Sequence, residues 1–224
     1  MVNTNDKGNT SGMKYIIMAG GDYSYWDRPK PMAELNGEPL IARTIRLLRE
    51  AGVKDIAISS NKPVFKRFGV PVLKHNNPFT VVGEDCYGYW VDCFYPTEEP
   101  ACYLFGDVVF SPNAIRTIVE YDADDITLFG SKKPFAPEYP KPYREPFAYK
   151  VANQKRFRNA IAEVKELHDI GVFKRHPIAW ELWAVICGTP PNKINKSYVG
   201  INDYTCDIDN PSEISLYENL IGDK

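Results

Sequence analysis

The sequence predicts an α/β protein with an open, largely parallel β-sheet covered by helices on both faces. From Met13 to about residue 130, short β-rich apolar runs alternate with segments in which apolar residues recur at helical spacing. The chain has 224 residues, enough to bury a large core within one domain. In such sheets ligands bind at the carboxyl ends of the strands, so the residues that follow each strand are candidate site residues.

Apolar periodicity and turn residues set the expected boundaries in the first part of the chain. Strands are predicted where short β-rich runs end near glycine, serine or aspartate, at residues 14–21, 53–60, 70–75, 101–106 and 124–131. Helices are predicted where apolar side chains gather on one helical face, at residues 40–52, 61–68, 84–95 and 112–121. Ser111 followed by Pro112 is a typical N-cap for the last of these helices.

The remainder of the chain departs from this alternation. Residues 132–146 hold five prolines, too many for a helix or a central strand, so an ordered loop is expected there. We then expect a strand over 147–153, helices over 154–168 and 179–188, and a strand, a turn and a closing helix within residues 205–221. Asn153 is the expected N-cap of the 154–168 helix. Asn210 or Asp209, before Pro211, is the expected N-cap of the closing helix.

Composition excludes several classes of protein. The chain carries 27 Lys and Arg against 29 Asp and Glu, without a run of five or six like charges, so neither a nucleic-acid face nor a polybasic membrane anchor is expected. It contains no run of 18 apolar residues, and its first dozen residues are polar, which favours a cytoplasmic protein. The five cysteines show neither a CxxC pair nor zinc-ligand spacing. Residues 1–12 are expected to be a tail, and residues 13–224 a single domain.

A candidate phosphate-binding loop follows the first predicted strand. Gly20 and Gly21 would let the backbone pass close to a phosphate, and Arg28 and Lys30 supply positive charge within the next ten residues. The spacing is neither that of a P-loop nor that of the dinucleotide-binding GxGxxG motif. A tight turn that binds no ligand is the alternative interpretation of the two glycines.

Carboxylates at two strand ends form a candidate metal site. Asp107 follows the strand ACYLFG, and Asp207 and Asp209 lie in the segment CDID near the C-terminus. Mg²⁺ prefers a small number of carboxylates together with substrate phosphates, and two acidic groups facing a phosphate-binding loop would provide such a site. A turn aspartate at 107 and a capping turn at 207–209 are the alternatives.

Other residues are candidates to shape the pocket. Ser60 and Asn61 end the second strand, where they would meet a base or ribose or form a plain turn, and the segment 75–78 (HNNP) ends the third. Lys150 is a candidate for binding an acceptor phosphate, and a solvated lysine is the alternative. Tyr25, with its neighbours Tyr23 and Trp26, is a candidate for stacking on a base or closing over the acceptor; packing against the proline-rich loop is the alternative. Trp180 and Trp183 are expected in the core or at a dimer contact.

Four sequence blocks occur in an order that resembles a known family. The blocks IIMAGG, RPKPM with LNGEPLIARTIRLLREAGVKDIAIS, YLFGDVVFS, and DIDNPSE are similar to nucleotidyltransferases of the sugar-1-phosphate and molybdenum-cofactor type. The resemblance covers about residues 13–130 and, more loosely, the final 20 residues. It implies a three-layer α/β/α Rossmann-like fold with a mixed sheet, as in nucleotide-diphospho-sugar transferases.

The resemblance also implies roles for particular residues. The loop Ala19, Gly20, Gly21 and Asp22, with Lys30, would bind a nucleoside triphosphate, and Asp107 with Asp209 or Asp207 would bind Mg²⁺. The family loop usually reads GxGxR, whereas here Gly20-Gly21 is followed by DYSYW, so Arg28 is the expected replacement for the loop arginine.

The implied reaction transfers a nucleoside monophosphate to a phosphorylated small molecule and releases pyrophosphate. The acceptor would be a sugar-1-phosphate, or else an alcohol phosphate or phosphonate. In such chemistry the protein positions the reactants and neutralises the developing charge, so no general base is needed. Two alternatives stay open: an inactive nucleotide-binding or scaffold protein of the same fold, because the loop departs from the pattern, and a glycosyltransferase of the same fold, because residues 207–209 have the form Asp-x-Asp. A homodimer is also left open.

Overall fold

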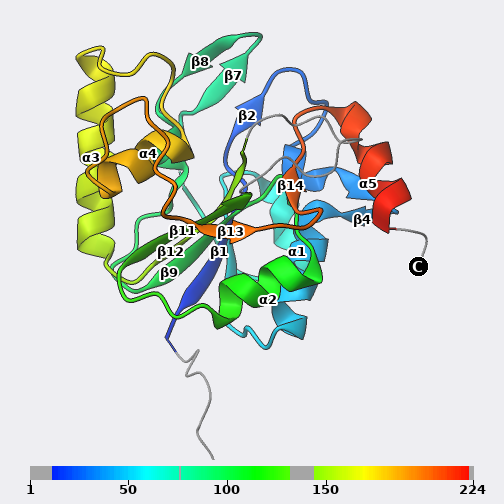
Figure 1. Ribbon diagram of the computed structural model, residues 1–224. Coiled ribbons are helices and arrows are strands. Elements are labelled where there is room, and N and C mark those ends of the chain that lie inside the picture. Colours follow the sequence, from blue (N-terminus) through cyan, green and yellow to red (C-terminus); the bar gives the residue numbers. More distant parts are fainter. Residues whose placement is uncertain (1–11, 76, 132–143, 222–224) are drawn as a thin grey trace, which may run out of the picture.

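A computed structural model describes residues 12–75, 77–131 and 144–221. Its centre is a seven-stranded sheet with the strand order β13-β11-β12-β9-β1-β5-β6. Helices α1 and α2 lie on one side of this sheet and α3 and α4 on the other (Figure 1). The strands are β1 (Lys14–Met18), β5 (Ile56–Ser59), β6 (Val72–Leu73), β9 (Ala101–Phe105), β11 (Ile126–Ser131), β12 (Pro146–Val151) and β13 (Val199–Ile201). The predicted three-layer α/β fold with a mixed sheet is therefore confirmed.

Strand direction places the carboxyl ends of the first strands at one edge. β1 lies between β5 and β9 and is parallel to both, with Met18 opposite Ser59 on one side and Phe105 on the other. β12 enters between β9 and β11 and is antiparallel to both. The loops that follow β1, β5 and β9 therefore meet at the same edge, and β12 begins there.

The helices form where apolar side chains and caps predict them. They are α1 (Leu40–Glu50), α2 (Pro112–Glu120), α3 (Gln154–Asp169), α4 (Ala179–Ile186) and α5 (Ile214–Ile221). The Ser111 hydroxyl accepts a hydrogen bond from the amide of Ala114, and the Asn153 side chain accepts one from Arg156, so these two predicted N-caps are confirmed. The third prediction is wrong in part, because Asn210 precedes the 3₁₀ helix η4 and its side chain makes no capping hydrogen bond, while α5 begins only at Ile214. Trp180 and Trp183 of α4 are each 5% exposed and belong to the main core.

Short elements cover the carboxyl edge of the sheet. They are the strands β2 (Asp22–Tyr23), β3 (Glu34–Leu35), β4 (Glu38–Pro39), β7 (Thr80–Val82), β8 (Asp85–Tyr87), β10 (Val108–Val109) and β14 (Cys206–Asp207), and the 3₁₀ helices η1 (Lys30–Met32), η2 (Pro63–Phe68), η3 (Trp90–Cys93) and η4 (Pro211–Glu213). A second apolar cluster, which includes Trp26, Leu35, Ile208 and Tyr217, packs the C-terminal segment against the loop after β1.

One predicted helix is wrong. Residues 84–95 form strand β8 and the 3₁₀ helix η3, with β8 paired antiparallel to β7. Gly88 has φ of 73°, and a Cβ there would lie 2.9 Å from the Pro78 carbonyl. The glycine therefore ends any helical run and lets two chain segments touch. The apolar spacing of this segment reflects packing of η3 against the core.

Some expectations lie outside the described residues. These are the proposed tail up to residue 11, Asn76, and residues 132–143 of the proline-rich segment. No helix in the described part of the chain is long and apolar enough to span a membrane. All five cysteines are free thiols.

Candidate active site

A cavity of about 290 Å³ opens at the carboxyl ends of β1 and β9. Its lining comes from the loop after β1, the β7–β8 hairpin, η3, the end of β9, the start of β12, the start of α4 and the C-terminal segment. Residues from these parts include Gly20, Gly21, Lys30, Phe79, Trp90, Asp107, Glu145, Ile178, Asp207 and Asp209. The cavity therefore lies where the strand order predicts a ligand site.

Lys30 lies at the centre of the charged groups. Its side chain is only 4% exposed, and its Nζ lies 3.5 Å from Asp107 Oδ2 and 3.6 Å from Asp209 Oδ1. The ammonium also lies 4.3 Å from the centre of the Tyr23 ring. Burial lowers the pKa of Lys30, but Asp107, Tyr25 and Asp209 outweigh it, so the pKa is raised overall. The side chain is thus held as a cation.

A glycine brings Asp107 to the end of β1. The Gly106 amide donates a hydrogen bond to the Met18 carbonyl at 3.0 Å. A Cβ at Gly106 would lie 2.3 Å from that carbonyl oxygen, closer than any side chain tolerates. Only glycine allows β9 to end in this contact, which delivers Asp107 beside the loop that carries Gly20 and Gly21.

A two-stranded ribbon joins the predicted carboxylates. β10 pairs antiparallel with β14, with Val108 opposite Asp207. The Ile208 amide donates to the Asp107 carbonyl at 2.9 Å, which extends the pairing to the aspartates themselves. The Trp26 indole donates to the Asp209 carbonyl at 3.1 Å. The structure therefore brings Asp107, from the middle of the sequence, and Asp209, from near its C-terminus, together around Lys30.

Glu145 is a site residue that the sequence did not reveal. One carboxylate oxygen from each of Glu145, Asp207 and Asp209 lies within 4.8 Å of the other two, and Glu145 is buried. Its backbone is fixed by Ser131, whose amide donates to the Glu145 carbonyl and whose hydroxyl accepts from the Glu145 amide, both at 2.8 Å. A Cβ at Gly130 would lie 2.6 Å from the Glu145 carbonyl oxygen, so glycine is needed for this approach.

The donor set of this cluster fits a hard divalent cation. Mg²⁺ binds oxygen ligands, usually one or two carboxylates with phosphates and water, and three carboxylates converge here from the residue before β12, from the end of β14 and from the segment after it. Asp207 and Asp209 are both predicted metal ligands. Asp107, the third predicted ligand, lies next to this cluster through its shared contact with Lys30.

Aromatic side chains form much of the remaining wall. Tyr23, Tyr25, Phe79, Trp90 and Phe105 all line the cavity. Tyr25 is 46% exposed and lies at the mouth. Its pKa is raised, because burial exceeds the opposing effect of Lys30. Except for Tyr23 and Tyr25, this aromatic lining was not predicted: Trp90 lies in the segment 84–95, where a helix was wrongly expected, and Phe79 lies just before β7.

The other predicted nucleotide-binding residues lie around the loop. Ala19 lines the cavity, and its carbonyl accepts a hydrogen bond from the buried Ser60 hydroxyl at 2.8 Å. Asp22 is exposed and pairs with Lys62, whose ammonium also contacts the Gly21 carbonyl at 3.4 Å. Asn61 is exposed and does not line the cavity. Ser60 therefore supports the loop, and Lys62 is a neighbouring cation that was not predicted.

The structure does not place Arg28 where a loop arginine would be needed. Its side chain is 49% exposed and pairs with Asp27, with Nη2 3.3 Å from Oδ2, and with Glu34 at 3.9 Å. It does not line the cavity. Among the described lining residues, Lys30 supplies the positive charge.

Lys150 lies at the opposite edge of the sheet from the cavity, which corrects its expected role. Because β12 is antiparallel, Lys150 pairs with Cys102, near the start of β9, and the opposite end of β12 enters the site. Its buried ammonium donates to three carbonyls at the end of α2, those of Ile118, Val119 and Tyr121, at 3.0, 3.0 and 2.6 Å. Lys150 therefore caps a helix and does not meet an acceptor.

The fold and the site together define a class of protein. A glycine turn after the first strand, a buried lysine between aspartates, and carboxylates at the sheet's carboxyl edge lie where the resemblance to nucleotidyltransferases leads us to expect them. The chain belongs to the family with a MobA-like NTP transferase domain, whose family model matches residues 15–176.

Solved structures share the fold. CTP:phosphocholine cytidylyltransferase from Streptococcus pneumoniae aligns with a TM-score of 0.54 at 14% identity, covering 94% of this chain and all of that one. A putative glucose-1-phosphate thymidylyltransferase from Bacillus anthracis aligns with a TM-score of 0.56 at 18% identity, covering 95% and 96%. 4-Diphosphocytidyl-2C-methyl-D-erythritol synthase from Anaerococcus prevotii gives 0.56 at 11%, covering 94% and 98%. At these identities the likeness shows the fold alone.

Proposed function

We propose that this protein is a Mg²⁺-dependent nucleotidyltransferase that transfers a nucleoside monophosphate from a nucleoside triphosphate to a phosphorylated small molecule, with release of pyrophosphate. The observation that carries the proposal is the buried Lys30 between Asp107 and Asp209, beside the Gly20-Gly21 turn and within the family match. The acceptor oxygen attacks the α-phosphorus, a new P–O bond forms, and the bond to pyrophosphate breaks with its electron pair leaving on pyrophosphate. Since the acceptor phosphate is already ionised, no side chain needs to remove a proton.

Each part of the site has a task in this reaction. The Gly20-Gly21 turn leaves room for the triphosphate to approach the backbone, since both glycines line the cavity. Lys30 neutralises charge that develops on the phosphates, and its raised pKa keeps it cationic at neutral pH. Asp107, Asp207 and Asp209, with Glu145, would hold Mg²⁺, which would supply charge to the transferring phosphate.

The charges of the cavity bear on the acceptor. Among the described residues, four carboxylates and one ammonium line it, together with five aromatic rings. Aromatic faces and carboxylates both attract cations. We therefore rank a phosphate ester or phosphonate that also carries a positively charged group first, ahead of a sugar-1-phosphate whose sugar is uncharged. Phosphocholine, which the name of one structural neighbour contains, is such a compound.

The test is pyrophosphate release from ATP, CTP, GTP and UTP with Mg²⁺, against phosphocholine, aminoalkyl phosphonates and sugar-1-phosphates. We expect release with one nucleotide and one acceptor class, and its loss with EDTA. Pyrophosphate release only with a sugar-1-phosphate whose sugar is uncharged would overturn the ranking of acceptors but support the reaction.

Two controls separate this proposal from the alternatives left open by the sequence. Asp107→Asn removes one carboxylate beside Lys30, and we expect it to abolish release. Lys54→Ala, at an exposed position before β5, should retain it. Nucleotide binding by the wild type without release for any acceptor would favour an inactive binding protein. Sugar transfer from a nucleotide sugar would favour a glycosyltransferase.

A further inference from the structure

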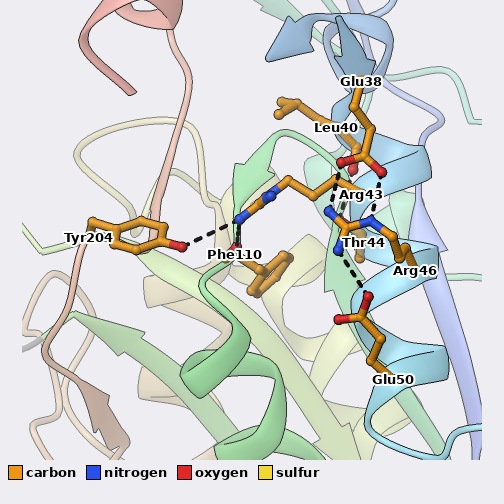
Figure 2. Close-up of polar contacts among 8 residues, drawn as sticks. All are labelled: Glu38, Leu40, Arg43, Thr44, Arg46, Glu50, Phe110 and Tyr204. Carbon is orange, nitrogen blue, oxygen red and sulfur yellow. Dashed lines mark hydrogen bonds and ion pairs between the residues drawn. The ribbon is translucent and has the colours of Figure 1, made fainter. Parts of the chain in front are cut away.

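Two arginines on α1 have contrasting surroundings (Figure 2). Arg43 is 6% exposed, and its Nη2 donates to the Phe110 carbonyl at 3.4 Å and to the Tyr204 hydroxyl at 3.3 Å. Arg46, less than one turn further along, pairs with Glu38 at 2.7 Å and with Glu50 at 3.0 Å near the surface. One helix thus carries a buried arginine that contacts distant segments and an arginine in local ion pairs.

The partners of Arg43 belong to the two arms of the β10–β14 ribbon. Phe110 directly follows β10, the strand that begins after Asp107. Tyr204 precedes β14, which leads to Asp209. One guanidinium therefore contacts both arms and joins them to α1 (Figure 2).

The same part of the ribbon is held by a second set of hydrogen bonds. The Ser111 amide donates to the Thr205 hydroxyl at 3.0 Å, and the Ser111 hydroxyl donates to Asp203 at 2.6 Å. The Asp203 carboxylate also accepts from the Thr205 amide at 2.8 Å. These bonds join the arms to each other, whereas Arg43 joins them to α1.

Burial of Arg43 is difficult to explain by stability alone. Its two hydrogen-bond partners within the described chain are a carbonyl and a hydroxyl, both neutral, and its Nε is buried without a partner. Removing a guanidinium from water costs several kcal/mol when a carboxylate does not compensate it. An apolar side chain of similar length would fill the space without that cost. What it would lack is a directed donor to each arm.

We propose that Arg43 is a positioning residue that fixes the separation of the Asp107 and Asp209 carboxylates and thereby sets the affinity of the site for its divalent cation. This inference rests on the proposed function, which assigns a metal to those carboxylates. Groups that hold metal ligands in place from outside the coordination sphere typically change metal affinity about 10–100-fold when removed. Arg43 does not contact the cavity, so its effect passes through the ribbon.

The test is calorimetric titration of the full-length protein with Mn²⁺. We expect Arg43→Met to weaken binding at least about tenfold. Arg43→Lys, which keeps a donor, should recover part of the affinity, and Tyr204→Phe, which removes a single hydroxyl and leaves no cavity, should weaken binding less than Arg43→Met. Arg46→Met, on the same helix, is the matched control and should bind like the wild type. Circular dichroism checks that each variant is folded, and Tyr204→Phe keeps the test decisive should Arg43→Met not fold.

The outcomes separate this inference from the proposed function. Wild-type affinity in folded Arg43→Met, or in Tyr204→Phe where Arg43→Met does not fold, would overturn the role of Arg43. Equal weakening in Arg46→Met would overturn it too, because the effect would then belong to α1 as a whole. Mn²⁺ binding that depends on Arg43, without pyrophosphate release for any substrate pair, would support the role of Arg43 and overturn the proposed reaction. No Mn²⁺ binding by the wild type would overturn the role of Arg43, while the proposed reaction would still be judged by pyrophosphate release.

Discussion

Substitution of Gly106 by alanine tests the close contact between β1 and β9. The added Cβ would lie 2.3 Å from the Met18 carbonyl oxygen and 2.9 Å from Pro31 Cγ, whereas ordinary contacts begin near 3.4 Å. The two strand ends must therefore separate by about 1 Å, which breaks the Gly106 to Met18 hydrogen bond. Overpacking costs about 1–3 kcal/mol and the lost hydrogen bond about 1 kcal/mol. Alanine also restricts the unfolded chain more than glycine does, which offsets about 0.4–1 kcal/mol of this loss of stability.

We therefore expect Gly106→Ala to lower the free energy of unfolding by about 2–3 kcal/mol, measured by urea unfolding followed by circular dichroism. Gly20→Ala is the matched control at the same edge. Its Cβ would meet the Asn77 side-chain amide at 3.2 Å, and a side chain adjusts more easily than a carbonyl. Its expected loss is below about 1 kcal/mol. If Gly106→Ala is as stable as Gly20→Ala, the ends of β1 and β9 can separate at little cost, and the reasoning is refuted.

Three further substitutions test charged groups. Lys30→Met should lower pyrophosphate release at least about 100-fold. The pKa of Lys30 is raised in the folded protein above its ordinary 10.5, so its charge stabilises the fold below about that pH, and this stabilisation is lost as the pH rises further. The difference in the free energy of unfolding between wild type and Lys30→Met, measured in urea, should therefore be constant from pH 7 to 10 and should shrink at higher pH. Glu145→Gln should weaken Mn²⁺ binding about tenfold by calorimetry, and unchanged affinity would remove Glu145 from the metal site. Lys150→Met should lower the free energy of unfolding by about 2–3 kcal/mol, because three carbonyls lose their donor. Pyrophosphate release at saturating substrate should stay at the wild-type rate. A slower rate would show that Lys150 has a role in the reaction.

Much of the fold could be predicted because its determinants are local. The strand before Gly20, the N-caps Ser111 and Asn153, and the apolar face of α1 each follow from a few neighbouring residues. Lys30 and Asp107 could be predicted as site residues because each follows a recognisable strand in a fixed order. These signals do not depend on which strands pair.

The remainder depends on contacts between distant segments. Glu145 reaches the cavity because β12 runs antiparallel and because Gly130, which has no side chain, lets the Glu145 backbone approach closely. Neither feature can be predicted from the residues near position 145. Lys150 was misassigned for the same reason, since strand direction decides which end of β12 faces the site. The strand β13 has only three residues and pairs at the sheet edge, so its sequence VGI gives little periodicity to detect.

The β10–β14 ribbon has a consequence for the newly made chain. Trp26 and Asp209, which meet at this site, are 183 positions apart. A ribosome that has released the first 200 residues has supplied the glycine turn, Lys30 and Asp107, but neither Asp207 nor Asp209. Strands β1, β5, β9 and β12 can assemble by then, while two of the four carboxylates are still missing. A product that ends before residue 207 therefore lacks two of the four carboxylates that line the cavity, and under the proposed function it should not release pyrophosphate.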